Sequence, residues 1–310
     1  MSFMSRRTFL ASSAALAGAA VIPAKAFADD EKVARESGVR LKLGLNAFSF
    51  DEPLRKGTMT LTDAVHFCAR NGIDALDTTA YYFPGYPKPP ADDFVYGLKR
   101  AAFVNGVAIS GTGVRNDFAV PDVETRQADV QMVKNWIEVA GKLGAPVIRV
   151  FSGKERPDGY TFNQVLKWMV ADFKAVAASG RQHGVVVALQ PHNDFLKTAA
   201  ETIRVIEAVN SPWFACILDI GSLRSGDPYA EIQRLVPYAV SWQIKENVWR
   251  NGKEEPTDLA KIKAIIDRSG YRGYLPFEAL DSRDPMQDVT NFLQKIRQAF
   301  APDCPIPKAS

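Results

Sequence analysis

Cysteine and histidine are scarce in this sequence, with three residues of each among 310. Cys68, Cys216 and Cys304 lie far apart and show no paired spacing, so they predict neither a disulfide framework nor a zinc site of the finger type. We expect inert thiols, because a free cysteine usually behaves as a small buried apolar residue.

The chain also lacks an excess of charge of either sign. Lys and Arg number 38 against 35 Asp and Glu, which gives a net charge of +3. This balance indicates no nucleic-acid partner and no attraction to an acidic membrane surface. With 46% hydrophobic and 24% charged residues, the composition is typical of a soluble globular protein that buries one large core. The sequence leaves the oligomeric state open.

An apolar, alanine-rich run occupies residues 9–23 near the N-terminus. Serine and glycine interrupt it, and it is shorter than the roughly 20 apolar residues that a membrane-spanning helix needs. Arg6 and Arg7 precede the run, and the small residues Ala26 and Ala28 follow it. This pattern resembles a twin-arginine export signal.

The twin-arginine resemblance implies that residues 1–28 are a signal peptide. Such signals direct folded proteins across the inner membrane, so we expect a periplasmic protein with no membrane span in the mature chain. An uncleaved anchor or an amphipathic tail is the alternative.

Short apolar runs alternate with longer segments of helical period from Val39 onward. The segment TLTDAVHFCARNG predicts a helix that Thr60 or Thr62 caps, and several helical segments end in glycine. The predicted strands are LKLGLNAFSF, IDALDTTA, VAISGTGV, PVIRVFSG, VVVALQPH, FACILDIGS, YAVSWQIKE and YLPFEAL.

Eight strands with intervening helices predict an α/β protein with a closed parallel (β/α)8 TIM barrel. We expect a single domain over residues 39–300 and a C-terminal tail over 301–310. An open doubly wound sheet is the alternative.

Polar side chains stand at or just beyond the C-terminal ends of the predicted strands. In a barrel these ends share one mouth, where barrel enzymes build their active sites. One polar strand end can simply cap the next helix, but eight around one mouth predict a site. The candidates are Asn46, Asp77, Arg149, Gln190, His192, Asp219, Gln243, Lys245, Glu246 and Glu278.

The motifs ALQPH, LDIGS, WQIKEN and YRGYLPFE, with the regions of Asn46 and Asp77, resemble the xylose isomerase-like barrel superfamily, especially its sugar phosphate isomerases/epimerases. The resemblance covers roughly residues 40–298. It implies a carbohydrate substrate and a divalent metal held by Glu, Asp, His and Glu after strands five to eight. Those four positions fall on Gln190, Asp219, Gln243 and Glu278.

Two of these four positions depart from the family pattern, because Gln190 and Gln243 carry amides. Ser222 also replaces a family histidine, whereas Lys245 is kept. The remaining oxygen donors suit Mn²⁺ or Mg²⁺ better than Zn²⁺. We therefore expect weak binding of Mn²⁺ or Mg²⁺; the alternative is that the metal is lost and both amides bind sugar hydroxyls.

The loss of one glutamate also limits the acid–base chemistry, because an amide cannot act as a base. Glu278 is the remaining candidate base, and His192, Lys245 and Glu246 are candidates for a second acid or base. Lys245 could instead polarise a substrate oxygen or form an ion pair with Glu246 or Asp219.

Aromatic residues gather near the predicted mouth, in the loop AYYFPGYPKPP (80–90) and in two tryptophans. They are expected to pack against sugar rings or, alternatively, only against the barrel rim. Arg149 could clamp an anionic group or pair with Asp77. The predicted substrate-binding residues are Asn46, Asp77, Arg149, Gln190, Trp242 and Trp249.

Three functions are consistent with these residues. The first is a metal-assisted isomerase or epimerase of a free sugar or ketosugar, which transfers a proton next to a carbonyl. The second is a lyase or hydrolase that cleaves an oxidised 3-keto glycoside by elimination, for which one carboxylate base suffices. The third is a non-catalytic exported sugar-binding barrel. The absence of a glycine-rich phosphate cradle favours a free sugar or glycoside over a sugar phosphate.

Overall fold

A closed barrel of eight parallel strands forms the centre of the protein in a computed structural model, which describes residues 40–280 and 284–300. The neighbours follow the order β1-β10-β7-β6-β5-β4-β3-β2. The strands are β1 (Arg40–Asn46), β2 (Ala75–Asp77), β3 (Ala108–Gly113), β4 (Val147–Val150), β5 (Val186–Leu189), β6 (Phe214–Asp219), β7 (Ala239–Lys245) and β10 (Arg272–Glu278). The predicted α/β TIM barrel is confirmed. The predicted signal peptide and tail, with Cys304, lie outside the described residues, and the domain boundaries 39 and 300 stay predictions.

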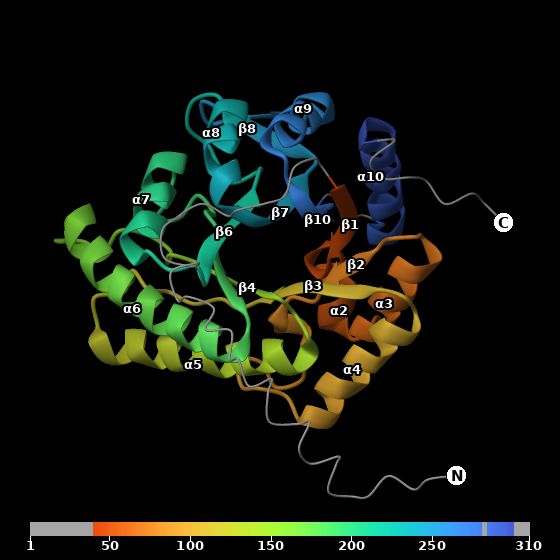
Figure 1. The fold of residues 1–310 in the computed structure, drawn as a ribbon, viewed down its shortest axis with the longest axis horizontal. Helices are drawn as coiled ribbons and strands as arrows, with labels where there is room; N and C mark the ends of the chain where they lie inside the picture. The colour runs from red at the N-terminus through yellow and green to blue at the C-terminus, as the bar shows by residue number, and fades with distance from the viewer. Residues whose placement is uncertain (1–39, 281–283, 301–310) are drawn as a thin grey trace, which may run out of the picture. The chain divides into compact units, whose positions relative to one another are not determined.

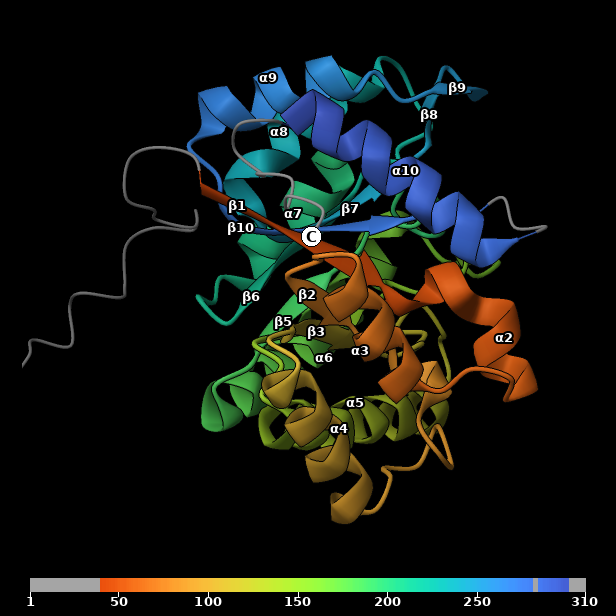
Figure 2. The ribbon, with the colours of Figure 1, turned by 90° about the vertical axis from the view of Figure 1, so that its right-hand side faces the viewer.

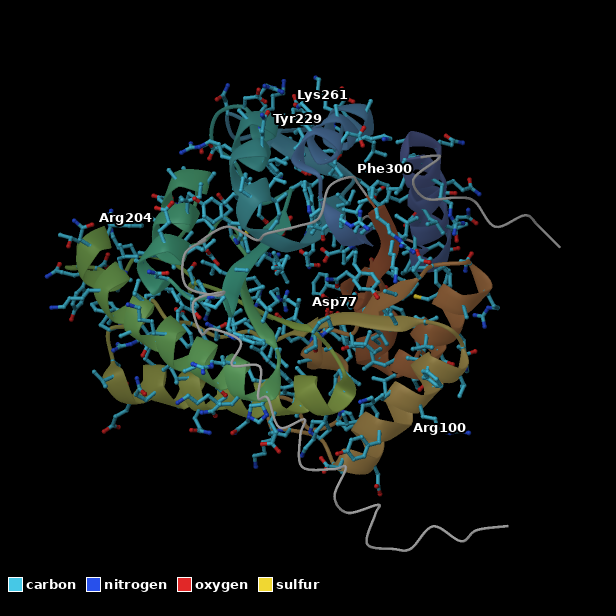
Figure 3. The ribbon with its side chains drawn as sticks, viewed as in Figure 1. Asp77, Arg100, Arg204, Tyr229, Lys261 and Phe300 are labelled. Atoms are coloured by element: carbon cyan, nitrogen blue, oxygen red, sulfur yellow. The ribbon has the colours of Figure 1, made fainter. Side chains whose placement is uncertain are left out.

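Helices cover the outside of the ring of strands (Figure 1). They are α2 (Asp51–Lys56), α3 (Leu61–Arg70), α4 (Asp92–Val104), α5 (Val123–Leu143), α6 (Phe162–His183), α7 (Ala199–Val209), α8 (Pro228–Leu235), α9 (Leu259–Ser269) and α10 (Pro285–Phe300). Figure 3 shows Asp77 within the ring, whereas Arg100, Arg204 and Lys261 lie on the surrounding helices. No helix within the described ranges has the length and apolar character to cross a membrane.

Local sequence fixes where several helices begin and end. Thr60, not Thr62, caps α3: its hydroxyl accepts a hydrogen bond from the backbone N–H of Asp63 at 3.1 Å, and the Asp63 carboxylate accepts one in return. Gly144 and Gly184 end α5 and α6 in the left-handed region, with φ of 84° and 68°. These are the glycine ends that the sequence predicts.

Two segments differ from the predicted strands. The first predicted strand stops at Asn46, because its side chain accepts a hydrogen bond from the N–H of Phe48 at 2.9 Å and starts the 3-10 helix η2 (Ala47–Phe50). After β7, an unpredicted antiparallel hairpin forms from β8 (Asn247–Arg250) and β9 (Lys253–Pro256). Its turn is Asn-Gly with both residues at positive φ, which is the usual chemistry of a two-residue hairpin turn.

The hydrophobic residues form a large cluster that joins the barrel to its helices and a small second cluster of Val147, Ala188 and Ile217. Each member of the small cluster lies two residues before a polar residue on its own strand. Since side chains alternate along a strand, the polar residues stand on the same face one layer nearer the carboxyl end. The pairs are Val147 with Arg149, Ala188 with Gln190, and Ile217 with Asp219.

The carboxyl ends of the strands therefore carry a polar layer. In Figure 2, β10 runs toward the side on which α2 and the hairpin β8–β9 lie.

Cys68 and Cys216 are buried free thiols. Burial raises the pKa of Cys68 to about 12, so that thiol stays protonated and unreactive at neutral pH.

Candidate active site

Three side chains from neighbouring strands form a buried hydrogen-bonded chain at the barrel mouth. The amide nitrogen Nε2 of Gln190 donates to Asp219 Oδ2 at 2.7 Å and to Gln243 Oε1 at 2.8 Å. Asp219 is fully buried, and its Oδ2 also accepts from the hydroxyl of Ser222 at 2.7 Å. Its Oδ1 accepts from the backbone N–H of Gly221 at 3.0 Å. Both oxygens of Asp219 are thus occupied by donors, which makes it a poor base.

Lys245 connects this chain to Glu278. The ammonium Nζ lies 2.7 Å from Glu278 Oε1 and 3.5 Å from Asp219 Oδ2, and all three residues are buried. Burial alone would lower the pKa of Lys245, but the two carboxylates outweigh it and raise that pKa above its usual value. Lys245 is therefore a permanent cation. The sequence suggested Glu246 or Asp219 as its ion-pair partner. Asp219 is a partner in the structure, and the nearer partner is Glu278, which was not among those two.

Arg149 holds the other end of the amide chain. Its Nη1 donates to Gln190 Oε1 at 3.4 Å and its Nη2 to the hydroxyl of Tyr81 at 2.7 Å, while the guanidinium lies 4.5 Å from the ring centre of Phe151. A Cβ at Gly113 would lie 2.5 Å from Arg149 Nε, so only glycine leaves room for this side chain.

Asp77 and Asn46 lie opposite each other at the ends of the paired strands β2 and β1. Burial raises the pKa of Asp77, and the nearby Arg149 charge opposes that rise without a direct ion pair between them. Asn46 Oδ1 accepts from Phe48 N–H and from the hydroxyl of Thr79, at 2.9 and 3.2 Å. Thr79 has a positive φ of 41°, a strained conformation for a β-branched residue. Asn46 thus shapes the wall of the site through its own backbone turn.

A cavity of about 470 Å³ opens at this mouth. Lys245 and Glu278 line it together with His192, Glu246 and Trp249. The volume lies within the range of small-ligand sites. The candidate base Glu278 therefore borders open space, where a ligand can reach it.

His192 lies at the rim of this cavity, with its ring 5.0 Å from that of Phe151. Withdrawal of the ring from water lowers the pKa of His192 to about 4, and the cations Lys245 and Arg149 act in the same direction, while Asp219 opposes them. The residue as a whole keeps an exposed surface. At neutral pH it is a neutral imidazole, which can accept a proton but not supply one as imidazolium.

The two predicted tryptophans lie in different surroundings. Trp242 is fully buried, packs against Tyr271 and alternates with Gln243 and Lys245 along β7, so it faces the helices; its contact with a substrate stays a prediction. Trp249 lines the cavity, and the guanidinium of Arg224 lies 4.0 Å from its ring centre. Trp249 belongs to β8, so the hairpin β8–β9 contributes an aromatic side chain to the cavity wall. The sequence did not predict this hairpin.

Most aromatic residues of the 80–90 loop hold the rim together. The hydroxyl of Tyr82 donates to Asp51 at 2.7 Å, and that of Tyr86 accepts from the backbone N–H of Arg115 at 2.9 Å. Tyr81 alone among these tyrosines supports a site residue, through its hydrogen bond to Arg149. The alternative of rim packing therefore describes most of this loop.

The sequence pattern SGTG in β3 indicated the site indirectly. A glycine in a strand interior often marks a close approach of another group. A Cβ at Gly111 would lie 3.0 Å from Asp77 Oδ2, as a Cβ at Gly113 would meet Arg149. Gly221 has the same role on another strand end, because its Cβ would lie 3.0 Å from Cδ of Lys245. These glycines were not among the predicted site residues.

Comparison with known proteins identifies the family. The model of the xylose isomerase-like TIM barrel family matches residues 45–296. The chain belongs to this family. The resemblance inferred from the strand-end motifs is thereby confirmed. No sequence among the curated proteins matches the chain.

Several enzymes are among the solved structures of the same fold. D-psicose 3-epimerase from Clostridium cellulolyticum H10, solved with D-tagatose, is 16% identical with a TM-score of 0.69, over 83% of this chain and 99% of that one. 3-keto-D-glucoside 4-epimerase from E. coli is 14% identical with a TM-score of 0.65, over 84% and 99%. A further protein, solved with a bound zinc atom, is 14% identical with a TM-score of 0.68, over 84% and 99%. At these identities the likeness shows the fold alone.

The residues at the four metal positions of the family do not fit a divalent ion in this chain. Gln190 turns its N–H groups, not its oxygen, toward Asp219 and Gln243. The ammonium of Lys245 contacts the carboxylates of Asp219 and Glu278, which are the two charged members of the set. Within the described residues there is no group of three or more His, Cys, Asp or Glu suited to a metal. The predicted Mn²⁺ or Mg²⁺ ligands are thus engaged with donors of the protein itself.

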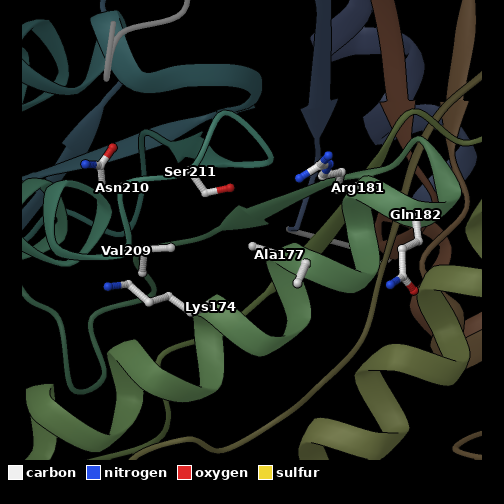
Figure 4. A pocket seen from close by; sticks show the side chains of 8 residues that line it. Lys174, Ala177, Arg181, Gln182, Val209, Asn210 and Ser211 are labelled. Atoms are coloured by element: carbon white, nitrogen blue, oxygen red, sulfur yellow. The ribbon is translucent and has the colours of Figure 1, made fainter. Parts of the chain in front are cut away.

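A second hollow, of about 660 Å³, lies between α6 and the segment after α7 (Figure 4). Lys174, Arg181, Gln182, Asn210 and Ser211 line it. It contains no carboxylate, imidazole or thiol that could perform acid–base chemistry, so the mouth cavity is the better candidate for an active site.

Proposed function

We propose that the protein is a sugar isomerase or epimerase that transfers a proton at a carbon next to a carbonyl of a free sugar or ketosugar. The observation that carries this proposal is the pair of Glu278 and Lys245 in the wall of the mouth cavity, with the nitrogen and oxygen 2.7 Å apart. A carboxylate next to a fixed cation is the arrangement needed to remove a proton while charge develops on a nearby oxygen.

The surrounding residues have distinct tasks in this proposal. Glu278 is the base. Gln190 and Arg149, whose side chains are buried, hold the polar layer of the mouth in place through their hydrogen bonds. His192, neutral at neutral pH, and Glu246 line the cavity and are the candidates for a second proton acceptor. Trp249 packs against an apolar face of the sugar ring.

The substrate class is supported by the family and by the cavity. Solved proteins of this fold include enzymes named for 3-epimerisation of D-psicose and for 4-epimerisation of a 3-keto-D-glucoside, both of which carry a ketone. The cavity of about 470 Å³ accommodates a ligand larger than a single small acid.

Hydrogen–deuterium exchange tests the proposal. The protein is incubated in D₂O with a panel of ketoses and 3-keto glycosides, and NMR follows deuterium entering carbon-bound positions and the appearance of epimers. We expect deuterium uptake at a carbon next to the ketone, without cleavage. A matched sample of E278Q is the control, because it keeps the size of the side chain but lacks the base.

A second function, elimination of the aglycone from a 3-keto glycoside, is favoured by one observation. The wall formed by Trp249 and Arg224, with a ring-to-guanidinium distance of 4.0 Å, extends the cavity beyond the Glu278–Lys245 pair and gives a second ring a surface to pack on. Release of the aglycone in the same experiment would select this function. Binding of the sugar with neither uptake nor release would select a non-catalytic sugar-binding barrel.

We also propose that the protein is exported by the twin-arginine route and acts in the periplasm. The support is the sequence alone, namely Arg6 and Arg7 ahead of an apolar run that ends before Ala26 and Ala28.

A further inference from the structure

Lys245 occupies the place between the two carboxylates of the family's metal set. Its ammonium contacts Glu278 at 2.7 Å and Asp219 at 3.5 Å. The positive charge is buried with both partners, and two negative charges this close to each other would repel strongly without a cation between them. A divalent ion would have to displace this ammonium to reach both carboxylates.

The amide at Gln190 is fixed in the orientation that opposes a metal. Its Oε1 accepts from Arg149, and its Nε2 donates to Asp219 and Gln243. A flipped amide would set N–H groups against the guanidinium and an oxygen against two acceptors, so the partners determine which way the group points. A metal needs oxygen lone pairs here, whereas the site presents N–H donors.

The backbone at Gly221 leaves space for the side chain of Lys245. A Cβ at Gly221 would lie 3.0 Å from Cδ and 3.3 Å from Cγ of Lys245, and 3.2 Å from the carbonyl oxygen of Asn247. Gly221 is not among the residues with positive φ, so its conformation does not demand glycine. The missing side chain leaves space for the aliphatic part of Lys245, which therefore belongs in this position.

We infer that this site transfers protons without a metal ion. Gln190 and Gln243 carry amides at two of the metal positions, and the ammonium of Lys245, a residue that the family also keeps, lies between the remaining carboxylates, Asp219 and Glu278. For its chemical step the inference rests on the proposed function. An ammonium has three N–H donors. Two face Glu278 and Asp219, and since Lys245 lines the cavity, the third is available to a carbonyl oxygen of the substrate.

The chemical step balances with these groups alone. Glu278 takes the proton from the carbon next to the carbonyl, the C–H electron pair becomes the carbon–carbon double bond of an enolate, and the carbonyl oxygen gains the negative charge. Lys245 keeps its protons and donates a hydrogen bond to that oxygen. Return of the proton from Glu278 to the same face of that carbon regenerates the substrate and the carboxylate, which accounts for hydrogen exchange. Formation of an epimer needs a proton delivered to the opposite face, for which His192 and Glu246 are the candidates. Loss of a preorganised donor such as Lys245 costs about a hundredfold to a thousandfold in rate, which is the fall in exchange that we expect for K245M.

Metal binding is tested first without any substrate. Protein treated with EDTA and then dialysed is titrated with MnCl₂ by calorimetry, and its melting temperature is measured with and without Mn²⁺. We expect no binding in the millimolar range and no thermal shift. The variant Q190E/Q243H, which restores a carboxylate and an imidazole at two family positions, is expected to bind Mn²⁺. Stoichiometric binding of Mn²⁺ by the unaltered protein would overturn the inference.

A lysine variant tests whether the ammonium and a metal compete for one place. K245M leaves Asp219 and Glu278 without their shared cation, so we expect it to melt at a lower temperature and to regain stability when Mn²⁺ is added. K167M removes a lysine from the exposed face of α6 and is expected to show no response to Mn²⁺. Equal responses of K245M and the unaltered protein to Mn²⁺ would contradict the inference.

Different results would contradict the proposed proton transfer and the inference of a metal-free site. Protein that binds no Mn²⁺ and exchanges deuterium on none of the sugars contradicts the proposed function and leaves the inference of a metal-free site standing. Protein that exchanges deuterium only when Mn²⁺ is present supports the proposed function and overturns this inference.

Discussion

Glu278 is the residue on which the proposed chemistry depends most. Among the residues of the network, Asp219 has both oxygens occupied by donors, whereas Glu278 contacts Lys245 through Oε1 and lines the cavity. We expect E278Q to lose about a hundredfold to ten-thousandfold in the rate of deuterium exchange, which is the usual cost of losing a general base. Circular dichroism checks that the barrel remains folded. Unchanged exchange by a folded E278Q would exclude Glu278 as the base.

Asp194 carries a pH dependence of stability. Burial raises its pKa from 3.8 to about 7, although hydrogen bonds from Ser152 and from the N–H of Leu196 oppose the rise. The unfolded chain therefore loses this proton at lower pH than the folded protein does. The contribution of Asp194 to stability falls as pH rises from about 4 to about 7, and stays low above that range.

The variant D194N isolates this effect, because an amide keeps the acceptor oxygen and does not titrate. We expect its melting temperature, relative to that of the unaltered protein, to increase steadily between pH 4 and pH 7. The comparison at each pH cancels the titration of other groups, including His192. A difference in melting temperature that does not change with pH would show that Asp194 titrates in its ordinary range.

Gly221 lies two residues beyond the end of β6 and packs against the side chain of Lys245. G221A would bring a methyl group within 3.0 Å of the lysine and 3.2 Å of a backbone oxygen. We expect a loss of about 1–3 kcal/mol in the free energy of unfolding, as for other overpacked sites, together with slower exchange because Lys245 shifts.

Gly97 offers a matched control for that substitution. It lies on the exposed side of α4, and a Cβ there would meet nothing within 4 Å. G97A is expected to stabilise the protein by about 0.5–1 kcal/mol, since alanine loses less backbone entropy than glycine in a helix. Thermal or urea unfolding measures both variants. If G221A and G97A behaved alike, Gly221 would not be the residue that makes room for Lys245.

The barrel elements were predictable because each buried strand is a short apolar run followed by polar residues. The hairpin β8–β9 was not predicted, since NVWR and KEEP carry no regular apolar alternation, although the intervening Asn-Gly is a known hairpin turn. The direction of Trp242 could be read from the sequence, because strand alternation places its side chain on the face of β7 opposite to Gln243 and Lys245.

The pairing of Lys245 was harder to predict than its position. Glu246 is its neighbour in sequence and also lines the cavity, whereas Glu278 reaches Lys245 only because β7 and β10 pair in the closed barrel, with Lys245 opposite Glu278. The orientation of the Gln190 amide likewise depends on Arg149, Asp219 and Gln243 together. Strand ends are local features of a sequence, whereas contacts across a mouth depend on strand order and register.

Export is tested with a variant of the full-length protein that carries a changed signal. Replacing Arg6 and Arg7 by lysine preserves charge but removes the guanidinium pair, so we expect the precursor to accumulate in the cytoplasm. Cell fractionation followed by immunoblotting measures the distribution, and a variant with lysines at Arg55 and Arg70, which lie in α2 and α3 of the barrel, is the control. Normal periplasmic accumulation of the signal variant would exclude the twin-arginine route.

The barrel closes where β1 pairs with β10, and this pairing limits how early in synthesis the protein can fold. The first strand pairs with β10, with Arg40 opposite Arg272, so the ring closes between segments that lie far apart along the chain. Closing so long a loop is entropically costly and slow. A ribosome must therefore release most of the polypeptide before β1 finds its partner, and until then β1 lacks one of its two neighbours and presents an unpaired edge. Chaperone protection of that edge during synthesis would shorten the time in which the nascent chain can aggregate.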